Sequence, residues 1–296
     1  MTYLDAEKRV LDLINSGLYS IVELSDVRKA FDVKLSSENT EYLSETLEEY
    51  KNYLKLIDSL PEKIKLGFLE TLKRNEIKHN QKAEHENMFL LELYRTLDPT
   101  NSIDLGIETI QTGLLPEDLE KLHDKIMEGT DEESFSKGYR KKDDIVVSGI
   151  ESGVNDIHFI PIRKEQIPEA MDLLCKFINS QADKEEEIFL KPFTIHALIA
   201  LLQSFPDGNT RLARLVHHLK IWDLTRRFNL SNINLLALYM SKSFYVMRGS
   251  YREKIRKIVV DKTDDAWNSW YRFSLNAVNE QLYYGIKNLE SIKRRL

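Results

Sequence analysis

The stretch that decides the fold is LLQSFPDGNTRLAR, residues 201–214, in which a tight turn separates two leucine-rich patterns. Apolar residues recur at helical spacing on both sides of this turn. They are Ile195, Leu198, Ile199 and Leu202 before it, and Leu212, Leu215, Val216 and Leu219 after it. The spacing predicts two buried helices that meet at Pro-Asp-Gly-Asn, residues 206–209.

The composition extends this helical prediction to the rest of the chain. The sequence has 296 residues, of which 42% are hydrophobic, enough to bury a sizeable core and to fold without help. Only 11 glycines and 7 prolines are present, so turn residues are sparse. We therefore expect an all-α, mainly helical fold.

Charge, the lack of long apolar runs and the single cysteine limit the partners and the location that we expect for the protein. The net charge is −6 with acidic and basic residues interspersed, which predicts neither a nucleic-acid nor a membrane partner. No run of about 18 apolar residues and no leader-like N-terminus occurs, so we expect a cytoplasmic protein. The single cysteine, Cys175, lies in the apolar stretch MDLLCKFI and is expected to be buried.

Helical periodicity with recognisable stops recurs along the chain, and one segment departs from it. Residues 136–161 contain several glycines and the β-branched run 145–147, and they are the only convincing hairpin candidate. The expected helices cover residues 4–14, a short helix from Ser25-Asp26, 41–60, a helix from 62, 89–97, 114–127 and 168–178.

The turn has the features of an anion-binding loop. Gly208 and Asn209 tolerate unusual backbone angles, so successive N–H groups can converge there at a helix start. Arg211 and Arg214 lie on one face of the following helix, where the helix dipole disfavours cations by roughly 0.3–1 kcal/mol. A bound phosphate could compensate them, and so could a salt bridge to an acid such as Asp207 or Asp223.

At these residues the chain resembles the Fic (Fic/Doc) family, whose signature reads H-P-F-x-D/E-G-N-G-R-x-x-R. The corresponding residues here are 203–214, QSFPDGNTRLAR, and His196 matches a histidine common in the preceding helix of the family. Flanking segments resemble the family's helices and its target-docking flap, and the likeness covers about two thirds of the chain. It implies a Fic fold with one β-hairpin flap. The expected division is an N-terminal helical region (1–100), a Fic-like core domain (101–245) and C-terminal helices packed on the core (246–296).

The resemblance also implies roles for the residues of the turn. Fic enzymes transfer AMP, or another phosphate-containing group, to a hydroxyl of a target protein. By this likeness Asp207 would hold Mg²⁺, and Phe205 would anchor the loop. The phosphates of ATP or of another phosphate-bearing ligand would be held by Gly208, Asn209, Thr210, Arg211 and Arg214.

Three residues depart from the signature. Gln203 stands at the position of the catalytic histidine, and an amide cannot act as a general base near neutral pH. Thr210 replaces a glycine and would narrow the phosphate cradle, and Ser204 replaces a proline. We therefore expect a Fic-like protein without normal AMP-transferase activity that retains a phosphate-binding or nucleotide-binding loop.

Many large Fic proteins carry an inhibitory helix with the pattern S/T-x-x-x-E-G/N. If the stretch KRNEIKHN is its counterpart, Arg74 and Lys78 occupy the serine and glutamate positions. This alignment predicts that the inhibitory glutamate is missing.

Three function classes remain open at this stage. The first is a regulatory or inactive Fic-like protein that holds a phosphate ligand and docks a protein segment at the 136–161 hairpin. The second is a slow or altered transferase, and the third is a helical interaction module without a ligand. The histidines lack metal-ligand spacing, the aromatic residues at 267–273 are expected to be core, and the oligomeric state is left open.

Overall fold

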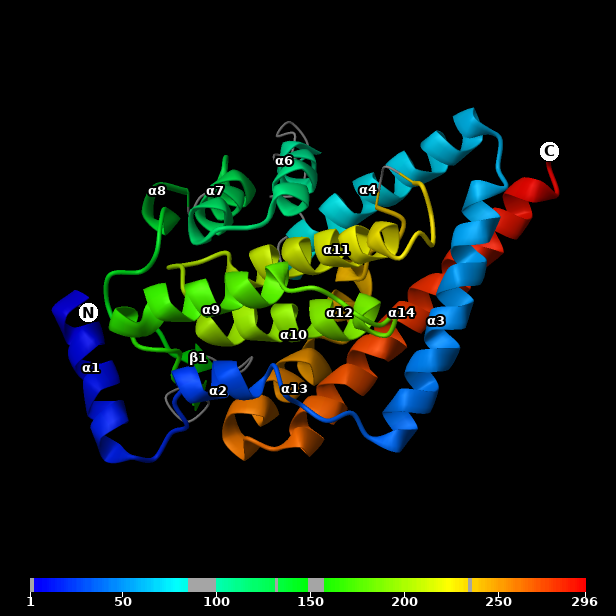
Figure 1. Cartoon of the computed structure of the whole chain (residues 1–296). Helices are drawn as coiled ribbons and strands as arrows, with labels where there is room; N and C mark the ends of the chain where they lie inside the picture. Colours follow the sequence, from blue (N-terminus) through cyan, green and yellow to red (C-terminus); the bar gives the residue numbers. More distant parts are fainter. Residues whose placement is uncertain (1–2, 85–99, 131–132, 149–156, 234–235) are drawn as a thin grey trace.

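The computed structural model describes residues 3–84, 100–130, 133–148, 157–233 and 236–296 (Figure 1). Helices dominate this part of the chain, so the predicted all-α class is confirmed. In chain order the elements are α1 (Tyr3–Ser16), α2 (Leu24–Lys29), α3 (Ser37–Asp58), α4 (Glu62–Glu84), α6 (Thr100–Thr112), α7 (Pro116–Met127), α8 (Glu133–Ser136), β1 (Val147–Ser148), β2 (Ile157–Phe159), the 3₁₀ turn η3 (Lys164–Gln166), α9 (Ile167–Asn179), α10 (Glu187–Leu202), α11 (Asn209–Arg227), α12 (Ser241–Val246), α13 (Arg248–Asp261) and α14 (Asp264–Lys293).

Helices α10 and α11 form the centre of the molecule and are joined by the 203–208 turn (Figure 1). Every side chain from residue 191 to 202 of α10 is buried, as expected for a helix that is apolar on all faces. Helix α11 is buried from residue 211 to 225 although it carries arginines, histidines, a lysine and an aspartate among its leucines. The central pair therefore brings charged groups into the interior.

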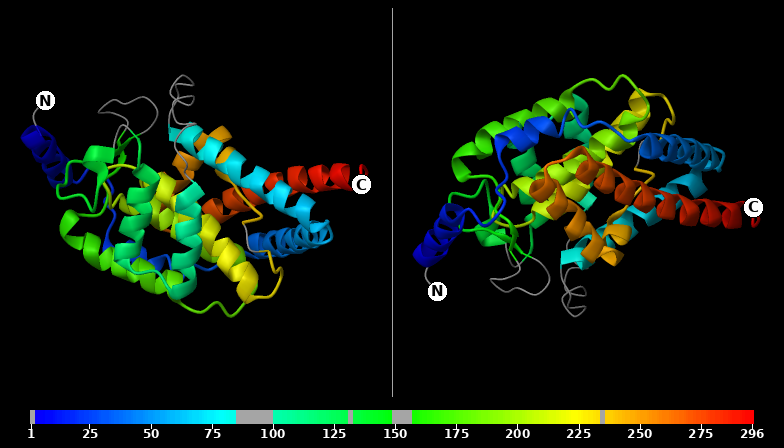
Figure 2. Two further views of the ribbon diagram at one scale, coloured as in Figure 1. Left: turned by 90° about the horizontal axis from the view of Figure 1, so that it is seen from above. Right: turned by 90° about the horizontal axis from the view of Figure 1, so that it is seen from below.

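The other helices cover this pair from several sides. Helix α9 packs on α10, and α6 and α7 pack on α11 and on each other. Helices α13 and α14 pack on α10, while α3 runs along α14 and α4 along α12. The two ends of the chain lie far apart, with α1 at one end of the molecule and the end of α14 at the other (Figure 2).

Most of the predicted helices are confirmed in the described residues, with shifts at their ends. Helix α1 ends at Ser16 before Gly17, which has φ 65°, and α7 begins with Pro116 at its first turn. Helix α3 begins at Ser37, earlier than expected, because the side chain of Ser36 caps it by accepting a hydrogen bond from Asn39 N at 3.3 Å. Helix α6 was not predicted, and the expected helix at 89–97 lies outside the described residues.

The hairpin expected within residues 136–161 is confirmed by the antiparallel pairing of β1 with β2. Val147 pairs with Phe159 and Ser148 with Ile157, while the connection between the strands lies outside the described residues. Beyond β2, Ile160 pairs with an N-terminal segment instead: Val22 N donates to Ile160 O, and Ile160 N to Ser20 O, both at 2.9 Å. One edge of the hairpin is thus already occupied by the chain itself.

Two packing expectations are also confirmed. Cys175 is buried in α9, and burial raises the pKa of its thiol to about 12, which makes it an unreactive core residue. The aromatic residues Trp267, Trp270, Tyr271 and Phe273 of α14 are all buried.

Within the described ranges, no helix is both long enough and apolar enough to span a membrane.

Candidate functional site: the turn between α10 and α11

Two residues in the left-handed backbone region shape the turn. Gln203 has φ 44° and ψ 50° and ends α10, and Gly208 has φ 75° and precedes the first residue of α11. The first helical bond of α11 runs from Leu212 N to Gly208 O at 3.0 Å. A helix start of this kind directs the N–H groups of its first turn outward, where they attract anions.

The aromatic residue of the signature anchors the turn in the core. Phe205 is fully buried and stacks on the imidazole of His123 from α7, with ring centroids 3.9 Å apart and an interplanar angle of 7°. His123 Nε2 donates a hydrogen bond to Asp207 O at 2.7 Å. His123 therefore fixes both the ring and the backbone of the turn, a role that the sequence did not predict for it.

Two amide side chains close the turn from within. Asn209 accepts a hydrogen bond from Phe205 N at 3.0 Å and donates one to Phe205 O at 2.8 Å. Asn209 also donates to Gln203 Oε1 at 3.2 Å, and Gln203 Nε2 donates to Ala200 O at 2.8 Å. Both ends of the Gln203 amide are thus bound inside the turn, and this side chain offers no proton acceptor for catalysis.

A buried arginine outside the signature joins the turn to the base of the hairpin. Arg140 Nε donates to Gln203 O at 2.8 Å, and Arg140 N donates to Ser204 O at 2.9 Å. Its guanidinium also donates to Ile162 O and to Asp143 Oδ1, the latter at 2.8 Å. The segments before and after the hairpin are therefore attached to the turn through one side chain.

The two signature arginines are both buried on α11. Arg211, with 6% of its surface exposed, makes one ion pair, from Nη2 to Asp207 Oδ2 at 3.3 Å. Its Nε is buried and has no hydrogen-bond partner in the described part of the chain. Asp223, the alternative acid, pairs instead with Lys220 at 2.7 Å and with Arg227 at 2.8 Å. The charge of Arg211 is thus only partly compensated by the protein.

Arg214 lies near a buried acid that the sequence alignment did not select. Burial raises the pKa of Glu76 on α4 to about 7, and the nearby charge of Arg214 opposes this rise. Glu76 accepts hydrogen bonds from Ser241 Oγ and, at 3.3 Å, from Ser241 N. Of the aligned positions, Arg74 is exposed and the Lys78 side chain lies outside the described residues. The acid of α4 that approaches Arg214 is therefore Glu76.

The residues of the turn fit a metal that is shared with a ligand. Asp207 accepts a hydrogen bond from Gly208 N through Oδ1 at 2.6 Å, and 43% of its side chain remains exposed. Mg²⁺ commonly binds one or two carboxylates together with substrate phosphates. Among the described residues no three His, Cys, Asp or Glu side chains gather, so a metal at Asp207 would need oxygens from the ligand.

We expect Gly208→Ala to destabilise the protein by about 2–3 kcal/mol, because a side chain at positive φ is strained and has no room here. A Cβ at this position would lie 2.5 Å from Met127 Sδ and 3.0 Å from His123 Nε2. The measurement is urea unfolding. Gly249→Ala is the matched control: this helical glycine has nothing within 4 Å of its Cβ position, so its substitution should stabilise by about 0.5–1 kcal/mol. Equal effects of the two substitutions would contradict the close packing at Gly208.

Together the fold and the turn define a class of protein: a helical protein whose two central helices meet at a buried, arginine-bearing turn, with a hairpin attached beside it. Residues 113–220 match the Fic/DOC family model, from the start of α7 into α11. A crystal structure of a Fic family protein from Desulfovibrio desulfuricans G20 is similar to the present structure with a TM-score of 0.55, at 15% identity. This alignment covers 86% of the present chain and 76% of the other. A search of curated proteins gave no match. The family match of residues 113–220 and this structural likeness support membership in the Fic/DOC family.

Proposed function

We propose that this protein binds a phosphate-bearing ligand of the nucleotide class at the 203–214 turn and lacks the usual AMP-transfer chemistry of its family. The observation that carries the proposal is Arg211. A guanidinium group has five N–H donors, yet Arg211 is buried with one long ion pair and an unpartnered Nε. A phosphate placed beside the helix start would supply the missing acceptors and the missing negative charge.

The absence of transfer follows from the residue at position 203. The signature histidine would take the proton of the attacking hydroxyl, and general-base catalysis contributes roughly 10²–10⁴-fold to a rate. Gln203 has no basic nitrogen, and its amide is already hydrogen bonded to Ala200 and Asn209. A bound nucleotide would therefore be held without efficient transfer.

We assign the metal and the phosphate-binding part of the turn to the same positions as in the signature. When Mg²⁺ is bound with the ligand, Asp207 would hold it and the metal would neutralise phosphate charge. The phosphate would face the backbone N–H groups at the start of α11, around Gly208, Asn209 and Thr210. The Asn209 side chain itself is hydrogen bonded to the backbone of Phe205 within the turn. Thr210 places a β-branched side chain where the signature has glycine, and this favours a ligand that approaches less closely.

A protein segment would dock at the hairpin by adding a strand. Because Ile160 already pairs with Ile21, the edge of β1 is the side that we assign to such a segment. Arg140 would connect this edge to the turn, since it contacts both the hairpin base and Gln203.

Calorimetric titration of ATP with Mg²⁺, followed by a radiolabelled transfer assay, tests the proposal. Binding without transfer supports the proposal. Transfer by the natural protein indicates a slow transferase, and neither binding nor transfer indicates an interaction module without a ligand. Arg211→Ala should weaken ATP binding by roughly 10–100-fold, because charged hydrogen bonds to phosphate are lost. Arg226→Ala at the exposed end of the same helix is the control and should bind as the natural protein does. Equal affinity of all three proteins would contradict the assignment.

A further inference from the structure

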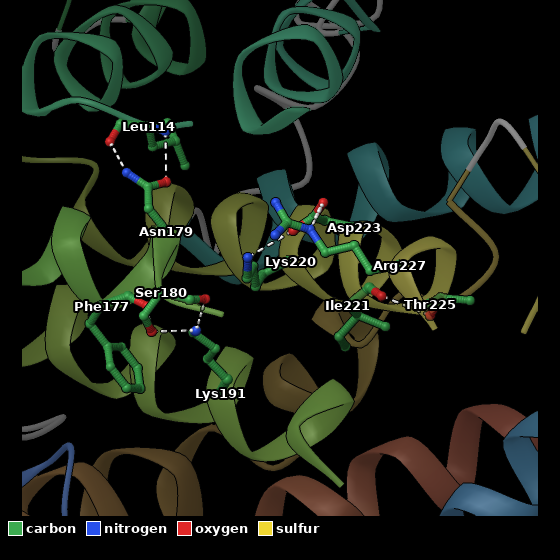
Figure 3. Close-up of polar contacts among 10 residues, drawn as sticks. All are labelled: Leu114, Phe177, Asn179, Ser180, Lys191, Lys220, Ile221, Asp223, Thr225 and Arg227. Carbon is green, nitrogen blue, oxygen red and sulfur yellow. Dashed lines mark hydrogen bonds and ion pairs between the residues drawn. The ribbon is translucent and has the colours of Figure 1, made fainter. Parts of the chain in front are cut away.

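At the opposite end of the α10–α11 pair, two lysines are buried that the turn does not use. Lys191 of α10 is 3% exposed and Lys220 of α11 is 1% exposed. Lysines are almost never buried this deeply unless they are paired with an acid, because a buried charge loses its hydration. Figure 3 shows the two side chains reaching in from facing helices.

The acids bonded to this cluster do not balance its cations. Lys191 Nζ donates to Ser180 O at 2.6 Å and to Ser180 Oγ at 2.7 Å, which are both neutral acceptors. Lys220 Nζ donates to Asp223 Oδ2, and Arg227 Nε donates to Asp223 Oδ1, so one carboxylate serves two cations. The cluster therefore holds three cations and one hydrogen-bonded carboxylate among the described residues (Figure 3).

The remaining charged neighbour, Glu187, reduces the excess but does not remove it. Glu187 acts on both lysines through space without a hydrogen bond to either, and its Oε1 accepts hydrogen bonds from the N–H groups of Asp183 and Lys184. Three cations therefore face two carboxylates. Burial, and then the charge of Lys220, lowers the pKa of Lys191 to about 8. The two ammonium groups thus repel each other in a setting with little water.

Several N–H donors of the cluster have no hydrogen-bond partner in the described part of the chain. An ammonium has three donors, of which Lys220 uses one and Lys191 two. The hydrogen bond of Arg227 uses Nε only, and 44% of this side chain is exposed. Arg227 is thus the member of the cluster that solvent reaches.

The surrounding backbone is fixed, so the donors are held in place without a ligand. Asn179 Nδ2 donates to Leu114 O at 2.7 Å, and Leu114 N donates to Asn179 Oδ1 at 2.9 Å. Ser180 Oγ donates to Phe177 O at 2.9 Å while it accepts from Lys191. These bonds secure the end of α9 against the start of α7 (Figure 3).

We propose that Lys191, Lys220 and Arg227 form a second anion-binding site, which takes a phosphate-type dianion. The excess positive charge and the unused donors are the features that such a ligand would satisfy, with Arg227 contacting it from the solvent side. The site lies at the far ends of α10 and α11 from the 203–214 turn, so it does not depend on the function proposed for the turn.

Sulfate is the probe, because its charge stays constant over the pH range of the experiment. Calorimetric titration of the full chain at pH 8, at constant ionic strength set with chloride, is run in two buffers of different ionisation enthalpy. Binding should take up a fraction of a proton, because an anion beside Lys191 raises the pKa of this lysine back towards its usual value. The 203–214 turn contains no lysine, so sulfate bound there has no lowered amine pKa to raise.

Lys191→Met and Lys220→Met should each lower the affinity for sulfate by about tenfold or more, because a charged hydrogen bond to the anion is lost. Both replacements fill a similar buried volume, and circular dichroism verifies the fold. Lys176→Met is the matched control: this exposed lysine of α9 pairs with Asp172, and its loss should not change the affinity. Unchanged sulfate affinity in both buried-lysine variants, or binding without proton uptake, would overturn the proposal.

Discussion

The double substitution Gln203→His with Thr210→Gly should raise AMP transfer from ATP to a protein hydroxyl by roughly 10²–10⁴-fold over the natural protein. Histidine restores a proton acceptor at the end of α10, and it tolerates the left-handed backbone that Gln203 adopts at φ 44°. Glycine at position 210 removes the β-branched side chain from the start of α11. The measurement is radiolabelled transfer to the protein itself and to proteins of a lysate.

Three comparisons make this result interpretable. The single change Gln203→His separates the effect of the base from that of the cradle. Adding Arg211→Ala to the double variant should abolish the gain, because the phosphate contact is removed. A folded double variant that binds ATP with Mg²⁺ in the calorimeter and still labels nothing would show that more than the base and the cradle has been lost.

Acidification should unfold the protein steeply below pH 6.5, because four buried histidines are held neutral. Burial lowers the pKa of His123, His196, His217 and His218, the last to about 3. The folded structure stabilises the neutral imidazole. His218 Nε2, for example, accepts a hydrogen bond from Met240 N at 2.9 Å, and a protonated nitrogen cannot accept one. The unfolded chain takes up these protons below pH 6.5 while the folded chain does not, so stability is present above pH 6.5 and lost as the pH falls.

One acid acts in the opposite direction. The raised pKa of Glu76, about 7, means that the folded chain keeps a proton which the unfolded chain releases above pH 4.5, so this group favours the folded state as the pH falls from 7 to 4.5. The three completely buried histidines, His196, His217 and His218, outweigh it by two protons, which corresponds to a loss of about 3 kcal/mol per pH unit. Because a domain typically has about 5–15 kcal/mol of stability, two pH units should remove a large part of it.

Urea unfolding at several pH values between 7 and 5 measures this slope. His217→Phe is the matched variant: His217 packs among the rings of Phe193, His196 and Phe244, and a phenyl ring cannot be protonated. The variant should flatten the slope by about 1.4 kcal/mol per pH unit. A stability that does not change between pH 7 and 5 would contradict the neutral burial of these histidines.

Several features could be predicted from the sequence because they depend on neighbouring residues. Helical spacing on both sides of residues 206–209 marked α10 and α11, and the glycine and proline stops marked α1 and α7. Apolar context was enough to bury Cys175 and the aromatic residues of α14. The resemblance to the Fic signature could be recognised for the same reason, because the residues of the signature are consecutive. The sequence alone also shows that Gln203 replaces the histidine. The proposed division into three regions stays a prediction.

Only the tertiary structure decided which distant groups meet at the turn. Arg140 reaches Gln203 across 63 residues, His123 reaches Asp207 across 84, and Glu76 reaches Ser241 across 165. No local pattern encodes such contacts, because whether a charged or polar side chain is buried depends on which helices pack on it. The same holds for Lys191 and Lys220, whose sequence neighbourhoods look ordinary and whose burial arises from the packing of α10 against α11. Hydrophobic periodicity fixes which face of a helix turns inward, while the identity of the facing residues is set by the fold as a whole.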